Sequence, residues 1–83
     1  MEYKKYDVIT LGDNTKLIVL ETLEYKGNIY LYVDVVNDEE TDTLDRYHII
    51  KVCKNNSVQK ETDLNVLTNI LPLFSKNIRL NNE

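Results

Sequence analysis

Two long runs of β-forming residues, separated by the turn Lys26-Gly27-Asn28, constrain the fold of this chain more than any other feature. Residues 15–25 are rich in Leu, Ile, Val and Thr, and residues 29–36 alternate Tyr with aliphatic side chains. Gly and Asn tolerate the positive φ that a tight turn requires, and β-branched and aromatic residues suit a pleated strand. The pattern therefore predicts a β-hairpin, which the rest of the chain must pair with or cover.

Both arms of this hairpin carry apolar residues on two faces. In the second arm, one face holds Ile29, Leu31, Val33 and Val35, and the other holds Tyr30, Tyr32, Asp34 and Val36. Two apolar faces are typical of a central strand that is covered on both sides, or of a dimer contact. In the first arm the alternation slips, and a β-bulge near Glu21-Thr22 would place on one side Ile18, Leu20, Leu23 and Tyr25.

Shorter strands and a helix are predicted outside the hairpin. The strands are residues 6–11, 44–53 and, at an edge, 58–60, with a polar acidic loop at residues 37–43. The helix begins near Asp63, because apolar residues then recur at spacings of three and four; they are Leu64, Leu67, Leu71, Phe74 and Ile78. Thr62 or Asp63 can cap its start, and Pro72 predicts a kink or a break.

These segments predict an α+β fold, in which a mainly antiparallel sheet of four or five strands has one C-terminal amphipathic helix packed on one face. We expect a single domain over residues 1–83, with about residues 1–5 and 80–83 frayed. The predicted core consists of Val8, Ile18, Leu20, Leu23, Leu31, Val33, Ile50, Val52, Leu64, Leu67, Leu71 and Phe74.

Charge and composition disfavour several classes of function. The net charge is −4, and residues 7–45 alone carry ten acidic and two basic residues. Such a surface repels phosphate, so direct nucleic-acid binding is not expected. The lone Cys53 cannot close an internal disulfide, and no signal-peptide core or apolar run of about 18 residues is present. We expect a cytoplasmic protein that neither enters a membrane nor holds a cofactor.

The order of turns and strands resembles the small bacterial YrzB-like family, also called the domain of unknown function 1292 family. The likeness lies in ITLGDNTKLIVLE and LETLEYKGNIYLYV and extends over about residues 6–75. It implies a small cytoplasmic bacterial α+β protein of uncharacterised function and supplies no catalytic residues. The acidic tail usual in that family is weaker here, because Lys76 and Arg79 are basic, so no role of that tail is carried over.

The densest charge lies at Asp38, Glu39, Glu40, Asp42 and Asp45. Carboxylates suit calcium, but the spacing D-x-D-x-D-G of a calcium loop is absent, so we predict no metal site. A solvated loop is the favoured interpretation, and a surface that docks a basic protein is the alternative.

Other reactive groups are sparse. His48 and Cys53 are five residues apart, which places them on opposite faces of an ideal strand and disfavours a catalytic pair. The carboxylates of Glu21, Glu24 and Asp34 have polar neighbours, so a solvated surface is favoured over acid–base chemistry. We therefore expect no catalytic residues.

Tyr25, Tyr30 and Tyr32 form the most informative group, because a tyrosine cluster on a sheet either packs in the core or contacts a protein. The leading hypothesis is a non-enzymatic protein–protein interaction module that binds through this sheet face or an edge strand, with a homodimer as a further option. The alternative is an acidic decoy or inhibitor of a nucleic-acid-binding protein. The candidate partner-binding residues are Tyr25, Tyr30, Tyr32, Asp34, Asp38, Glu39, Glu40 and Asp42.

Overall fold

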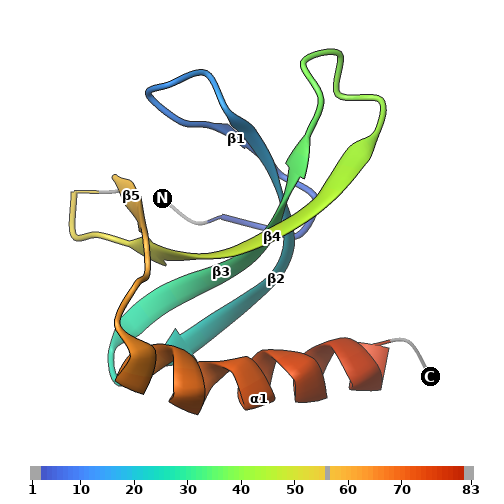
Figure 1. Cartoon of the computed structure of the whole chain (residues 1–83). Helices are drawn as coiled ribbons and strands as arrows, with labels where there is room; N and C mark the ends of the chain where they lie inside the picture. Colours follow the sequence, from blue (N-terminus) through green and yellow to red (C-terminus); the bar gives the residue numbers. More distant parts are fainter. Residues whose placement is uncertain (1–2, 56, 82–83) are drawn as a thin grey trace.

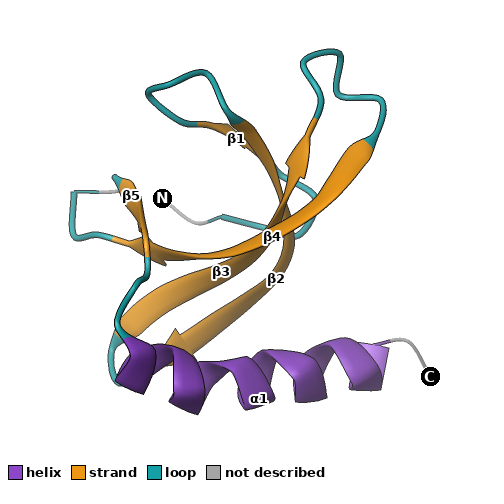
Figure 2. Cartoon of the chain, in the orientation of Figure 1, coloured by secondary structure: helices purple, strands orange, loops and turns teal. Residues whose placement is uncertain are grey.

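The chain forms a curled antiparallel sheet and one C-terminal helix (Figure 1), in a computed structural model that describes residues 3–55 and 57–81. The strands follow one another in the sheet in sequence order: β1 (Val8–Thr10), β2 (Lys16–Tyr25), β3 (Asn28–Val36), β4 (Thr43–Val52) and β5 (Val58–Lys60). The helix α1 (Leu64–Asn81) lies across the end of the sheet where β2 and β3 turn (Figure 2). The predicted α+β fold is confirmed.

The β2–β3 hairpin turns at the predicted place, but Asn28 belongs to β3 and the positive φ expected there falls on Lys26. Tyr25 pairs with Asn28, and the two residues between them have positive φ, 50° at Lys26 and 81° at Gly27. This geometry matches the twist of the flanking strands, and Gly27 adopts it without a steric penalty.

The concave face of the curled sheet encloses the first of two apolar cores. Its fully buried members come from the three central strands and are Leu17, Val19, Leu31, Val33 and Ile50. Ile9 of β1 and Val58 of β5 pack against this cluster from the two edges of the sheet. A short strand at each edge therefore completes the core, because each supplies an apolar side chain that the central strands cannot bury alone.

The second core lies between the opposite face of the sheet and α1. It contains Tyr30, Ile49, Ile70 and Phe74, with Leu23, Tyr25, Tyr32, Val66 and Leu67 packed around them. Thus both faces of β3 are covered, as its two apolar faces predict. Each fully buried large side chain stabilises the fold by about 1.5–3 kcal/mol.

A β-bulge in β2 distributes its side chains between these cores. The register of β2 on β3 shifts between Val19 and Glu21, slightly before the predicted position. Leu17 and Val19 therefore face the concave core, whereas Leu23 and Tyr25 face the helix. Because of the bulge, β2 contributes apolar side chains to both cores.

The buried face of α1 differs from the predicted one. Ile70 and Phe74 are buried, whereas Leu64 is 77% exposed and Leu71 is 45% exposed. Two overlapping stripes, one through Leu64 and Leu71 and the other through Ile70 and Phe74, both satisfy helical spacing. Contact with the sheet decides between them, so the prediction that Leu64 and Leu71 are core residues is wrong.

Other predicted core positions also differ. Val8 is 41% exposed, because its neighbour Ile9 faces the concave core and successive strand residues point to opposite faces. Ile18 and Leu20 are only half-buried. The core predictions for Leu31, Val33, Ile50 and Phe74 are confirmed.

The helix starts as predicted and does not break. Asp63 caps it, since its Oδ1 accepts hydrogen bonds from the backbone N–H groups of Asn65 (2.8 Å) and Val66 (3.4 Å). Pro72 lies inside one continuous helix rather than separating two.

Both ends of the described chain join the fold. Tyr3 packs against the concave core, and the backbone N–H of Tyr6 donates to the carbonyl of Val19 (2.6 Å). The helix extends to Asn81, and the prediction that about residues 1–5 and 80–83 fray stays a prediction. Residues 1–2 and 82–83, also predicted to fray, lie outside the described residues.

Candidate functional site

The three tyrosines of the predicted interaction surface occupy different environments. Tyr30 is 3% exposed beneath α1, so it cannot contact a partner, and that prediction is wrong. Tyr25 is half-buried at the end of β2, where the ammonium of Lys26 lies 5.5 Å from its ring centroid. Tyr32 is half-buried and remains accessible beside the helix. The face carrying these tyrosines is the face that α1 covers, because β3 supplies the floor of the second core.

Tyr32 forms part of an aromatic row that reaches the surface. Its ring stacks on that of Tyr47, with centroids 5.5 Å apart and planes inclined by 6°, and it meets Phe74 at 5.9 Å. Tyr47 is 48% exposed. A hollow of about 320 Å³ opens beside the row and is lined by Tyr32, Leu71, Phe74 and Ser75. We call the aromatic row and the lining of the hollow together the seam, because they lie where the helix meets the sheet. The seam consists of Tyr32, Tyr47, Leu71, Phe74 and Ser75.

An irregularity in β4 lies directly before Tyr47. Tyr47 pairs with Asp34 and Thr43 with Val36, so three residues of β4 bulge opposite one residue of β3. Within this bulge Asp45 has a φ of 53°. Tyr47 itself pairs in regular register, on the same face of the sheet as Tyr32.

Asp34 holds the bulge in place. It is 2% exposed, and its Oδ1 accepts a hydrogen bond from the backbone N–H of Arg46 (2.8 Å). Its predicted place on an acidic surface is therefore wrong. The reason is that the bulge leaves a backbone donor of β4 without a partner on β3, and the carboxylate supplies one.

Negative charge concentrates at the tyrosine hydroxyls of the seam. The Tyr47 hydroxyl donates to Oδ1 of Asp45 (3.1 Å). That hydrogen bond, the charge of Asp45 and the charge of Asp34 raise the pKa of Tyr47. Burial, followed by the charge of Asp34, raises the pKa of Tyr32. The site therefore favours neutral phenols and attracts positive charge.

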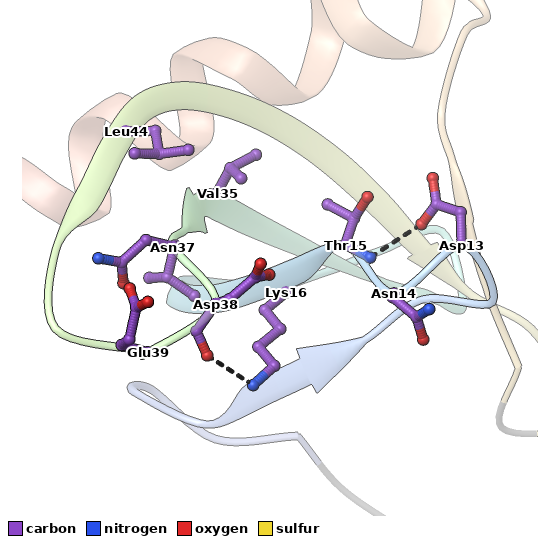
Figure 3. A pocket seen from close by; sticks show the side chains of 10 residues that line it. Asp13, Asn14, Thr15, Lys16, Val35, Asn37, Asp38, Glu39 and Leu44 are labelled. Carbon is purple, nitrogen blue, oxygen red and sulfur yellow. Dashed lines mark hydrogen bonds between the residues drawn. The ribbon is translucent and has the colours of Figure 1, made fainter.

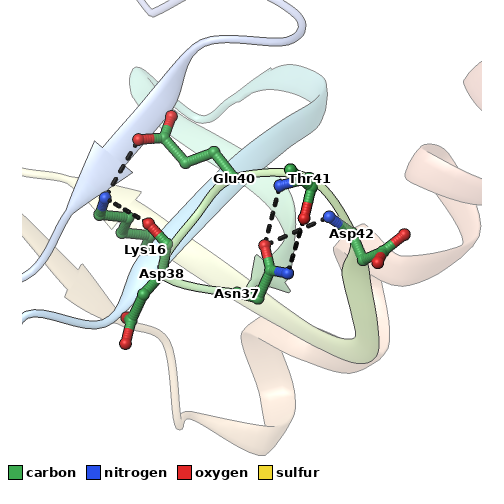
Figure 4. A network of polar contacts seen from close by, with 6 residues as sticks. All are labelled: Lys16, Asn37, Asp38, Glu40, Thr41 and Asp42. Atoms are coloured by element: carbon green, nitrogen blue, oxygen red, sulfur yellow. Dashed lines mark hydrogen bonds and ion pairs between the residues drawn. The ribbon is translucent and has the colours of Figure 1, made fainter.

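The acidic loop between β3 and β4 is ordered by one asparagine. The side-chain oxygen of Asn37 accepts hydrogen bonds from the backbone N–H groups of Thr41 (2.9 Å) and Asp42 (3.2 Å), and its amide nitrogen donates to the Thr41 hydroxyl (2.9 Å; Figure 4). Lys16 ties the loop to β2 by donating to the Asp38 carbonyl (2.9 Å) and the Glu40 carboxylate (3.1 Å). Because the Asn37 side chain satisfies backbone N–H groups of the loop, it stabilises one loop conformation.

The predicted acidic residues of this loop are at the surface. Asp38, Glu39, Glu40 and Asp42 are all exposed, and Glu40 is paired with Lys16. A shallow cleft of about 580 Å³ separates the loop from the β1–β2 turn, and Figure 3 shows residues of both turns that line it. Its apolar lining comes from Val35, Val36 and Leu44, and its acidic lining from Asp13, Asp38 and Glu39.

The remaining polar candidates do not converge. His48 lies on the concave face with Ile50, and burial, followed by the charge of Lys60, lowers its pKa. Cys53 follows the end of β4 and is half-buried. Glu21 is 7% exposed and forms an ion pair with Lys5 (3.2 Å), so the prediction of a solvated carboxylate is wrong there. Within residues 3–55 and 57–81, no three His, Cys, Asp or Glu side chains are grouped so as to hold a metal ion.

The sequence pattern does not single out Tyr47 or Leu71 as surface residues of one site. Leu71 belongs to an apolar stripe that predicts burial, and Tyr47 lies in a run that predicts an ordinary strand. One sequence feature could have indicated the irregularity in β4. It is Asp45-Arg46, two charged residues that come directly before Tyr47 in an otherwise apolar strand.

Comparisons of the chain with protein-family models, with curated proteins and with solved structures gave no match. In the part of the chain that the structure describes, no helix is long and apolar enough to cross a membrane.

Proposed function

We propose that the chain is a non-enzymatic, cytoplasmic protein–protein interaction module that binds its partner through the seam. One observation carries the proposal: the exposed ring of Tyr47 lies flat against Tyr32, and Tyr32 in turn lines a hollow together with the exposed Leu71. Tyrosine is enriched among the residues that dominate binding energy at protein interfaces. Kinship with the YrzB-like family stays a prediction.

The geometry of the seam suits binding because its parts are already fixed. Tyr47 is held by the stack with Tyr32 and by the hydrogen bond to Asp45. Phe74 forms the floor from a helix that is anchored by its own buried face. The seam side chains therefore lose little conformational entropy when a partner binds, which favours affinity.

A pull-down with matched variants tests this proposal. The tagged chain is exposed to a lysate of its source cells with nuclease, at low and high salt. Leu71→Asp places a charge in the seam, whereas Leu64→Asp places it on a leucine of the same helix that is 77% exposed and outside the seam. We expect a stoichiometric protein to survive high salt and the Leu64 change but not the Leu71 change. Equal retention by both variants would refute the proposal.

A second candidate function is an acidic decoy that occupies the basic surface of a nucleic-acid-binding protein. The observation that favours it is the set of exposed carboxylates held in one ordered loop, at Asp38, Glu39, Glu40 and Asp42. Changing these residues to their amides should release basic proteins from the pull-down, and high salt should do the same. Retention that is indifferent to both changes would exclude this function.

A further inference from the structure

We infer that the seam recognises an arginine of the partner, which lies over the open face of Tyr47 while a neighbouring apolar side chain of the partner enters the hollow beside Tyr32. This inference rests on the proposed function, because it names the chemistry of the partner. A fixed aromatic ring, a carboxylate at its edge and an adjoining apolar hollow carry it.

The ring of Tyr47 has one occupied and one open face. One face stacks on Tyr32, and β5 pairs only with Ile50, Lys51 and Val52, so no described strand lies beside Tyr47 on the outer side of β4. The 48% exposure of Tyr47 is consistent with this position. A planar guanidinium stacks well on such a face, and cations are attracted to the ring quadrupole.

The charge around Tyr47 favours a cation. The Tyr47 hydroxyl donates a hydrogen bond to Oδ1 of Asp45. Among the described residues no group donates a hydrogen bond to Oδ2 of Asp45, so this oxygen can accept one from a partner. The carboxylates of Asp45 and Asp34 both act on this hydroxyl and raise its pKa. An arginine can stack on the ring and donate to Asp45 at once. Lysine lacks the planar group, and its compact ammonium is more strongly hydrated.

The hollow adds an apolar requirement next to the cation. It shares Tyr32 with the aromatic row, and Leu71 and Phe74 form its other apolar walls. Its volume of about 320 Å³ admits one aliphatic side chain. The partner segment therefore combines an arginine with a nearby Leu, Ile, Val or Met.

The test is a selection of random phage-displayed peptides on the intact chain, followed by affinity measurements. We expect enriched peptides to share an arginine, and replacement of that arginine by lysine or citrulline to weaken binding. Tyr47→Leu should weaken binding roughly 2- to 30-fold, the range of a cation–π contact. Tyr6→Leu is the matched control, because Tyr6 is 71% exposed and outside the seam. Asp45→Asn should also weaken binding while keeping a residue that tolerates the positive φ.

Three outcomes would overturn the arginine inference. They are the absence of enriched peptides, enriched peptides without arginine, and equal binding to wild type and Tyr47→Leu. If arginine-free peptides are lost on Leu71→Asp but not on Leu64→Asp, the seam still binds and the proposed function survives. Sedimentation of the wild type is the last check, because a dimer abolished by Tyr47→Leu would place a second copy at the seam instead.

Discussion

Adjacent residues of α1 provide a sharp test of how the helix lies on the sheet. Ile70 is fully buried in the second core, whereas Leu71 is 45% exposed. Truncating a buried isoleucine to alanine typically costs about 2–5 kcal/mol. Truncating a half-exposed leucine should cost under about 1 kcal/mol. Both changes improve helix propensity by only a few tenths of a kcal/mol, so burial dominates the difference.

Urea unfolding followed by circular dichroism measures this difference. With a slope near 1 kcal/mol per M, Ile70→Ala should lower the midpoint by about 2 M or more, and Leu71→Ala by less than about 1 M. A domain of this size has a total stability on the order of 5 kcal/mol, so Ile70→Ala should retain about 0–3 kcal/mol of it. Equal effects, or a larger effect of Leu71→Ala, would refute the described orientation of α1. Such a result would indicate that the helix buries the face that carries Leu71.

Two further predictions concern the acidic loop and the seam. Asn37→Ala removes three side-chain hydrogen bonds, so amide exchange at Thr41 and Asp42 should accelerate while the sheet stays protected; unchanged exchange would contradict this role. The pKa of Tyr47 is raised above its ordinary 10.0, so its contribution to stability is present below that value and is lost as pH rises through the folded-state pKa. Phenolate absorbance should therefore appear at lower pH in Asp45→Asn than in wild type, and identical titrations would disprove the contact.

The features that the sequence predicts correctly are local. The hairpin follows from Gly27 between two β-forming runs, and the start of the helix follows from Asp63 before an apolar period. The edge strand β5 is short but bounded by turn residues. In each case the physical cause lies within a few residues, so one sequence suffices to reveal it.

The features that the sequence does not predict depend on contacts between distant residues. The stack of Tyr47 on Tyr32 depends on the register of β4 on β3, and the adjoining bulge in β4 is held by Asp34 of the neighbouring strand. The burial of Ile70 in place of Leu71 depends on how α1 meets Tyr30 and Ile49. In both cases spacing alone permits two arrangements, and packing selects one.

If a partner binds at the seam, site-specific photocrosslinking in the source cells should capture it there. The photoreactive residue p-benzoylphenylalanine replaces Tyr47 in one variant and Tyr6 in the other, since both positions are well exposed. The account predicts a discrete crosslinked protein from position 47 and none from position 6. Crosslinks from position 6 alone, or from neither position while a partner is retained in the pull-down, would contradict it.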